Sequence, residues 1–287
     1  MATDIEKANE LYQEANMIFF MEWSLFNSVR YKMFKQKAHD MFVEAGEIYQ
    51  KIGLLDNARN SYSQAGITSE YHLKDLDLAI REFNMAGDIS IRYSSALSVP
   101  CYAKAVSLYI KTENHEGVEH YTDLVVEKLE LYRAHKSLIS SFYEKVIEEY
   151  VHFVNKNIPT SFITKYKFKH AEYLFRAKNY KRAFELFIES DKDLTVRSCV
   201  YACLTSMVSK GTDAPKYFDH INKMYNEFSK TSQFLLVQRI MNSLQNKRLG
   251  EVKDALKKLN INGKNFDLFY PRAMDKIENR KTSSSSE

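Results

Sequence analysis

The sequence predicts an all-α protein, built as a solenoid of antiparallel helical hairpins that ends in a C-terminal helical bundle. The prediction depends on scarce turn residues, apolar stripes at helical spacing and a repeated short string. Only 8 glycines and 4 prolines occur among 287 residues, whereas an all-β chain would need many more for its turns. Because 45% of the residues are hydrophobic, the chain can bury a substantial core.

The first two helices are expected near the N-terminus. Thr3 and Glu6 have the spacing of a capping box, which marks a helix start. Apolar residues then recur on one helical face at Ile5, Ala8, Leu11, Tyr12 and Ala15. A second stripe contains Phe34, Ala38, Phe42, Ala45, Tyr49 and Ile52, and Gly53 ends it.

A repeated string supports the hairpin array. "FVEAG" begins at residue 42, "YSQAG" at 62 and "FNMAG" at 83, so the strings stand 20 and 21 residues apart, one helix and a turn each. The small Ala lets antiparallel helices approach closely, and the aromatic residue fills the space beside it. This spacing is typical of tetratricopeptide-like helical hairpins. We expect these residues to be buried: Phe42, Ala45, Tyr62, Ala65, Phe83 and Ala86.

The rest of the chain continues in helices, about fourteen in all. Residues 1–213 are predicted to form the hairpin array with an apolar loop near 16–27, residues 214–280 the C-terminal bundle, and residues 281–287 a disordered tail. The further helices are expected at 100–111, 116–133, 137–156, 161–177, 180–190, 194–209, 214–229, 232–245, 249–259 and 267–280.

Charge and cysteine usage limit the class of protein. The 41 basic and 37 acidic residues nearly balance, at a net charge of +4, so no nucleic-acid partner is expected. Three cysteines are an odd number without a disulfide framework, which favours a reducing compartment. The charged N-terminus differs from a signal peptide, and no apolar run approaches ~20 residues. We therefore expect a cytoplasmic protein whose membrane contact would be peripheral.

Residues for catalysis or metal binding do not gather in the sequence. The eight histidines are scattered, and there is no phosphate-binding loop, nucleophile elbow or dinucleotide fingerprint. Cys199 and Cys203 stand four residues apart and could hold a metal with other ligands, although buried small side chains are the more ordinary interpretation. We expect neither an enzyme nor a cofactor nor a metal site.

One segment does not fit a polar, soluble chain. Residues 16–26 read "NMIFFMEWSLF". Such a segment either continues a helix into the core, where aromatic residues usually belong, or forms an exposed surface for an apolar partner. Periodicity alone favours neither alternative.

Several blocks, in order, resemble the soluble NSF attachment proteins, and the chain is more like the alpha-type than the gamma-type members. They are "KAHDMFVEAGEIYQKIGLLDNARNSYSQAG", "DLDLAIREFNMAGD", "AEYLFRAKNYKRAFELFIES" and "NEFSKTSQFLLVQRIMNSL". The resemblance implies a twisted sheet of antiparallel helices with a C-terminal helical bundle. It also implies an adaptor of vesicle trafficking and membrane fusion, which binds the four-helix SNARE complex and recruits the hexameric ATPase NSF.

The resemblance also implies site residues. Phe19 and Phe20 occupy the place of a membrane-touching Phe-Phe pair, and Trp23, Leu25 and Phe26 would extend that apolar surface. Aromatic rings suit the bilayer interface because they settle at headgroup depth. Basic residues that bind the SNARE bundle would be Lys104, Lys181 and Arg182.

The region that should dock the ATPase departs from the family. An acidic stretch is expected before the last helices, but this chain has "SLQNKRLGEVKD", and residues 247–281 carry 10 basic and 5 acidic groups. The chain also ends in "NRKTSSSSE", without the family's terminal leucine. If docking is retained, Lys247 and Arg248 would meet compensating acidic residues on the ATPase.

A generic tetratricopeptide-like scaffold, which binds a peptide or a complex subunit, is the alternative. It explains the repeats but not the apolar segment at residues 16–26, and a buried segment would favour it.

Overall fold

The computed structural model describes residues 2–21, 28–154, 160–189, 196–259 and Ala273. These residues are almost entirely helical and contain no β-strand, which confirms the predicted all-α class. The chain divides into two compact units, Met1–Ile158 and Pro159–Glu287. The expected boundary between residues 213 and 214 lies within the second unit, immediately before α11.

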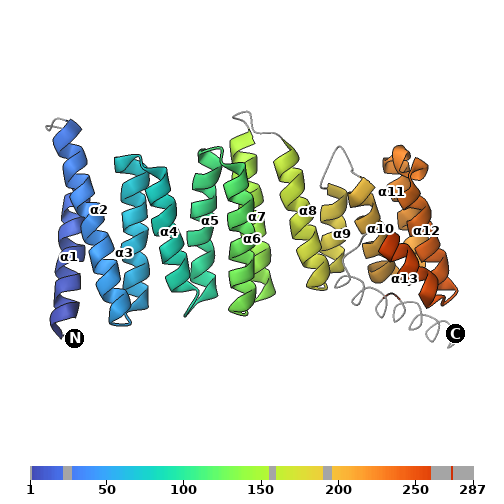
Figure 1. Ribbon diagram of the computed structural model, residues 1–287, viewed down its shortest axis with the longest axis horizontal. Coiled ribbons are helices and arrows are strands. Elements are labelled where there is room, and N and C mark those ends of the chain that lie inside the picture. Colours follow the sequence, from blue (N-terminus) through green and yellow to red (C-terminus); the bar gives the residue numbers. More distant parts are fainter. Residues whose placement is uncertain (1, 22–27, 155–159, 190–195, 260–272, 274–287) are drawn as a thin grey trace. The chain divides into compact units, whose positions relative to one another are not determined.

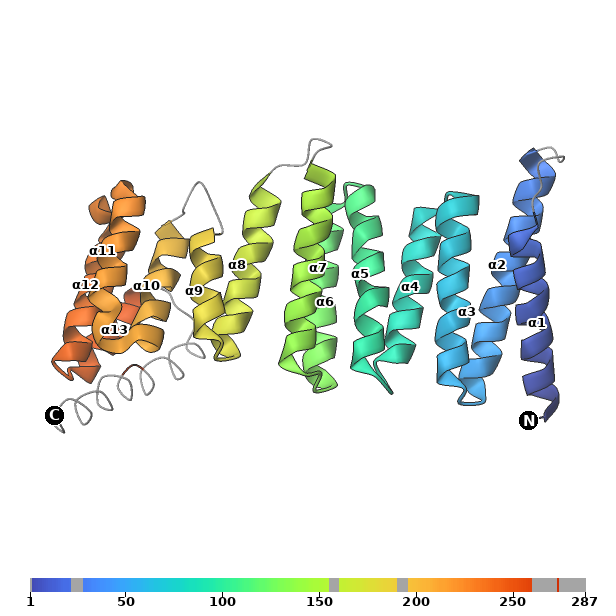
Figure 2. The ribbon, with the colours of Figure 1, turned by 180° about the vertical axis from the view of Figure 1, so that it is seen from behind.

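The first unit is a row of antiparallel helices in which each helix from α1 to α5 packs on the next, and α5 also packs on α6 and α7. Figures 1 and 2 show α1 to α5 side by side in chain order. Its elements are α1 (Ala2–Phe20), α2 (Ser28–Lys51), α3 (Leu55–Thr68), the π-helix η1 (Ser69–Leu73), α4 (Leu76–Ser90), α5 (Ser95–Lys111), α6 (His115–Leu131) and α7 (Lys136–Val154).

The second unit continues the helical pattern with shorter elements. Contacts join α8 to α9, α9 to α10, and α12 to α13, and α10 also packs on both α11 and α12. Its elements are α8 (Thr160–Arg176), α9 (Tyr180–Glu189), α10 (Val196–Lys210), the 3-10 turn η2 (Gly211–Asp213), α11 (Ala214–Met224), the 3-10 turn η3 (Asn226–Lys230), α12 (Ser232–Gln245) and α13 (Leu249–Lys258). The helix expected at 267–280 lies outside the described residues, except for Ala273.

The repeated string forms the core between α2 and α5. Its six aromatic and alanine side chains are all buried, which confirms the sequence prediction. The glycine of each string also has a packing role, because the aromatic ring of the following helix lies against it. A Cβ atom added at Gly46 or Gly66 would stand 3.0 Å from the ring of Tyr62 or Phe83, and one at Gly87 would stand 2.4 Å from that of Tyr102. These glycines permit the close approach of successive helices.

Five of the described turns share one backbone geometry that needs few glycines. After α2, α5, α6, α8 and α12, the second residue beyond the helix takes a positive φ, and the N–H of the next residue donates to the carbonyl five residues back, as in a Schellman motif. Leu54 N–H, for example, donates to the Tyr49 carbonyl at 2.9 Å. Gly53 takes the left-handed position once, and the other such turns use Glu113 (φ 56°), Arg133 (φ 54°), Lys178 (φ 73°) and Lys247 (φ 58°).

This geometry predicts that Glu113→Gly stabilises the protein. A residue with a Cβ in the left-handed region costs about 1 kcal/mol that glycine does not incur. We expect the free energy of unfolding to rise by about 1 kcal/mol in urea denaturation. Glu116→Gly, in the first turn of α6, is the control and should lower it by a similar amount. A loss of stability in Glu113→Gly would show that the glutamate makes a compensating contact.

Candidate membrane and partner surfaces

Large apolar side chains are exposed at the end of α1 and the start of α2, which lie at the same end of this hairpin (Figure 1). Phe20 exposes 72% of its surface and Met33 exposes 67%. Isolated exposed apolar residues are ordinary, but a group of them indicates a contact surface. We name this group the apolar tip: Met17, Phe20, Met21, Val29 and Met33.

The two adjacent phenylalanines of α1 face different environments. Helix α1 continues through Phe20, so the first part of the loop expected near 16–27 is helical. Phe19 is half-buried and packs edge-on against Phe42 (6.4 Å between ring centroids) and His72 (5.0 Å), whereas Phe20 points outward. Trp23, Leu25 and Phe26, also predicted to contact the membrane, lie outside the described residues.

A buried lysine fixes the base of the apolar tip. Lys35 is 1% exposed, and its ammonium group donates to the backbone carbonyls of Ile18 (3.3 Å) and Phe19 (2.5 Å) at the C-terminal end of α1. The Nζ atom also lies 5.3 Å from the ring centroids of Phe19 and Tyr31. Burial lowers the pKa of Lys35. A cation at a helix C-terminus complements the helix dipole, so this lysine holds the last turn of α1 in place.

The π-helix η1 places Glu70 against two lysines of α5. Glu70 is 4% exposed, and its carboxylate lies 2.9 Å from the ammonium of Lys104 and 2.5 Å from that of Lys111. Lys104 Nζ also lies 5.5 Å from the ring centroid of Tyr71. Lys104, predicted to bind SNAREs, therefore has an intramolecular partner, and two lysines beside one carboxylate leave a net positive charge.

The two other predicted SNARE-binding residues lie at the start of α9. Arg182 pairs with Glu185 (3.2 Å) and Glu189 (3.4 Å) on its own helix. Lys181 is exposed. Lys181 and Arg182 belong to the second unit and Lys104 to the first, and the SNARE-binding role of the three residues stays a prediction.

The predicted ATPase-docking residues lie at the turn between α12 and α13. Lys247 takes the left-handed position of that turn, and Arg248 precedes the first residue of α13. Both side chains are exposed. Arg248 also lies 3.3 Å from the carboxylate of Glu251.

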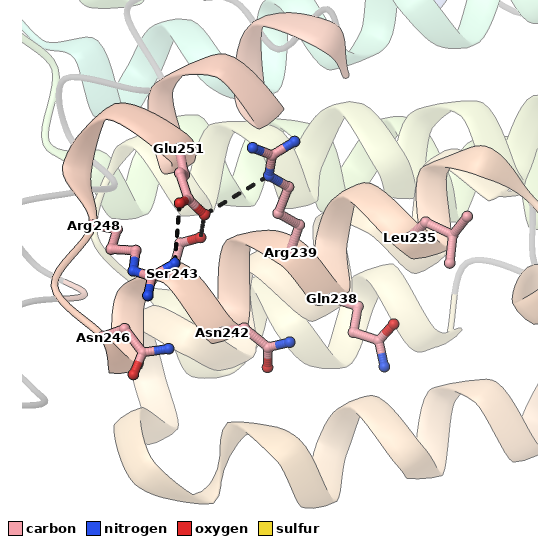
Figure 3. A pocket seen from close by; sticks show the side chains of 8 residues that line it. All are labelled: Leu235, Gln238, Arg239, Asn242, Ser243, Asn246, Arg248 and Glu251. Atoms are coloured by element: carbon pink, nitrogen blue, oxygen red, sulfur yellow. Dashed lines mark hydrogen bonds and ion pairs between the residues drawn. The ribbon is translucent and has the colours of Figure 1, made fainter.

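A polar hollow extends from Arg248 along the outer face of α12 (Figure 3). Glu251 accepts a hydrogen bond from the Ser243 hydroxyl at 2.8 Å and lies 3.9 Å from Arg239 Nε. The Ser243 bond and the two arginine charges hold the pKa of Glu251 below its usual range. The hollow is lined by Leu235, Gln238, Arg239, Asn242, Ser243, Asn246, Arg248 and Glu251.

The hollow could not be located from the sequence. Of its lining residues, only Arg248 was predicted as a site residue. Val237, Ile240 and Leu244 of α12 are buried, so the pattern could identify the outer face of the helix. Every amphipathic helix has such an outer face, and the sequence pattern does not show which of these faces borders a hollow.

The cysteines provide packing rather than a reactive site. Cys199 and Cys203 are fully buried in α10. Burial raises the pKa of Cys199 to about 12 and that of Cys203 well above its ordinary value, which keeps both thiols protonated. Within the described ranges, no three acidic, histidine or cysteine residues form a group that could hold a metal ion. None of the described helices is long and apolar enough to cross a membrane.

Comparisons with known proteins leave the family open. No family model matches the sequence, and no curated protein matches it either. Among solved structures, the chain is similar to BtubC (BKLC) from P. vanneervenii, at 11% identity and a TM-score of 0.33, over 84% of this chain and 92% of that one. Likeness at this level carries no argument about function.

Proposed function

We propose that the chain is an adaptor that binds assembled SNARE complexes at the membrane and recruits an NSF-type hexameric ATPase for their disassembly. In this role it is a cytoplasmic protein, held peripherally at the membrane. The observation that carries the proposal is the apolar tip at the end of the first hairpin of a helical-hairpin solenoid.

The composition of the apolar tip suits a bilayer interface. Phe20 and the exposed methionines offer apolar surface that can settle among lipid headgroups without a spanning helix. Lys32 lies beside Val29 and Met33 around a shallow hollow on α2, and its charge would favour anionic lipids. Lys35 supports this surface because it fixes the last turn of α1.

The adaptor role further requires two protein partners. A four-helix SNARE bundle with acidic surfaces would be attracted by basic residues such as Lys104 and Lys181 over about 10 Å. The ATPase would dock at Lys247 and Arg248, and it must present acidic residues there because like charges repel at a desolvated interface. No nucleic acid, metal or cofactor belongs to this function.

The experiment that tests the proposal uses liposomes that carry an assembled SNARE complex. We expect the chain to bind them, to retain the ATPase when hydrolysis is blocked, and to support disassembly when ATP is supplied. Phe20→Ser should weaken liposome binding about tenfold, because it removes one exposed aromatic side chain, while binding to a soluble SNARE bundle and the melting temperature stay unchanged.

Two control variants separate membrane contact from folding. Phe19→Ser should lower the melting temperature, since Phe19 packs against Phe42. Leu131→Ser removes another apolar side chain, 77% exposed at the end of α6, and should leave liposome binding unchanged. A large drop in the melting temperature of Phe20→Ser would contradict the proposed membrane contact.

A tetratricopeptide-like scaffold for a peptide or complex subunit is the second candidate. It is favoured by the intramolecular partners of Lys104 and Arg182, since paired basic residues attract an acidic bundle less than free ones. If the chain binds neither the SNARE bundle nor liposomes but does bind a peptide, it is such a scaffold.

A further inference from the structure

The outer face of α12 carries a row of side-chain amides. Gln238, Asn242 and Asn246 follow one another at intervals of four residues and project from the same side of the helix (Figure 3). All three are exposed, and their amides make no hydrogen bond to any residue that the structure describes. Each amide can donate and accept at once, as a peptide group does.

The spacing of the amides matches an extended chain. Four residues of an α-helix rise about 6 Å, and two residues of an extended strand advance about 6.6 Å. Successive amides can therefore pair with alternate peptide groups of one strand laid along α12. From Leu235 to Asn246 the helix rises about 16 Å, the length of about five extended residues.

The charges around the hollow indicate that the bound peptide segment is acidic. The hairpin of residues 232–259 contains six basic and two acidic residues, and Arg239 and Arg248 both border the hollow beside a single carboxylate, that of Glu251. Arg239 Nε stands 3.9 Å from this carboxylate, beyond hydrogen-bond length. Arg248 Nη1 donates to the same carboxylate at 3.3 Å, which uses one of the five N–H donors of its guanidinium group. Both guanidinium groups thus keep N–H donors for the carboxylates of a partner.

We propose that this hollow binds an acidic peptide segment of about five residues in extended conformation. Gln238, Asn242 and Asn246 pair with its main chain, while Arg239 and Arg248 pair with its carboxylates. Leu235, 62% exposed at the far end, contacts an apolar side chain of the segment. Because Arg248 is also assigned to ATPase docking, the inference deepens the proposed function: it names the chemistry of the docked segment.

The test measures peptide binding without SNAREs, membrane or ATPase, so its outcome is separate from that of the adaptor role. The probe is a fluorescein-labelled decapeptide of alternating glutamate and serine with one leucine, titrated against the full chain by fluorescence anisotropy. We expect Kd below about 1 mM, as for a small interface. The double variant Asn242→Ala with Asn246→Ala should weaken binding about tenfold, and Arg239→Gln with Arg248→Gln by at least as much.

Matched controls make the result specific. Gln245→Ala changes an exposed amide of α12 that does not line the hollow, and Lys253→Gln removes an exposed charge of α13 away from it; both should bind as the unchanged chain does. A decapeptide methylated on its main-chain nitrogens should lose binding. The proposal is overturned if the peptide does not bind, if the methylated peptide binds equally well, or if inorganic phosphate or single-stranded DNA displaces the peptide because it binds more tightly.

Discussion

Gly87→Ala is expected to destabilise the first unit by about 2–3 kcal/mol, although glycine-to-alanine changes within helices usually stabilise by up to about 1 kcal/mol. The added Cβ would lie 2.4 Å and 2.6 Å from two ring atoms of Tyr102. That ring cannot move aside easily, because Tyr102 is fully buried and its hydroxyl donates to Asp88 at 2.7 Å. Helices α4 and α5 must therefore separate, or Tyr102 must leave its position.

The measurement is urea denaturation followed by circular dichroism, with two comparisons. Gly250→Ala in α13 is the matched control, since no described atom beyond its chain neighbours and its own helix backbone lies within 4 Å of the added Cβ, and it should stabilise by up to about 1 kcal/mol. Gly46→Ala, at 3.0 Å from Tyr62, should fall between the two. Equal effects of Gly87→Ala and Gly250→Ala would refute the proposed packing role.

The glycine contacts show how far the repeat could be interpreted from sequence. Spacing alone predicted that Phe83 and Ala86 are buried, because a helix of period 3.6 places them on one face. It did not predict that Gly87 is the contact surface for Tyr102. That contact depends on the distance between helices α4 and α5, which is a tertiary quantity.

Helix boundaries were predicted less well where local signals conflict. A helix was expected to start at residue 100, which is a proline. The structure begins α5 at Ser95 and includes Pro100 within it. Pro100 is the sixth residue of α5 and removes one hydrogen bond of the helix interior, a loss that the packing of buried Ser98 and Val99 in the preceding turn offsets. The helix end at Phe20 likewise depends on the tertiary contact with Lys35.

The candidate surfaces were predicted in part. The apolar composition of residues 16–26 pointed to Phe20, which the structure exposes. Lys35 was missed, since "YKMFKQK" contains three lysines and nothing in the string separates the buried one from the exposed Lys32 and Lys37. Sequence likewise could not show that Lys104 is paired, because Glu70 lies 34 residues away.

Glu70→Gln is expected to destabilise the protein by about 2–3 kcal/mol at pH 7. Removing one partner of a buried ion pair costs about 3–5 kcal/mol, and we reduce this value because Lys104 and Lys111 are each about a third exposed. The variant leaves two ammonium groups close together without their shared carboxylate. Urea denaturation at pH 7 measures the effect, and Glu10→Gln, which removes an exposed carboxylate of α1, controls for the change in charge.

The stability lost in Glu70→Gln should become smaller as the pH falls. Burial raises the pKa of Glu70, but the hydrogen bonds and charges of Lys111 and Lys104 outweigh burial and lower it below its ordinary value. A carboxyl group with a lowered folded-state pKa contributes stability that is complete above its unfolded pKa, about 4.3, and is lost as pH falls through the folded value. The difference in the free energy of unfolding between the unchanged chain and Glu70→Gln should therefore be complete at pH 7 and should shrink below about pH 4.

The same variant tests what Lys104 does. If its main role is to neutralise Glu70, then Lys104→Gln added to Glu70→Gln should recover part of the lost stability, because one of two opposed ammonium groups is removed. If Lys104 instead serves an acidic partner, Glu70→Gln frees its charge and should strengthen binding to a soluble SNARE bundle despite the weaker fold. Strictly additive losses in the double variant would contradict the structural role. Unchanged binding in Glu70→Gln would remove Lys104 from the SNARE-binding surface.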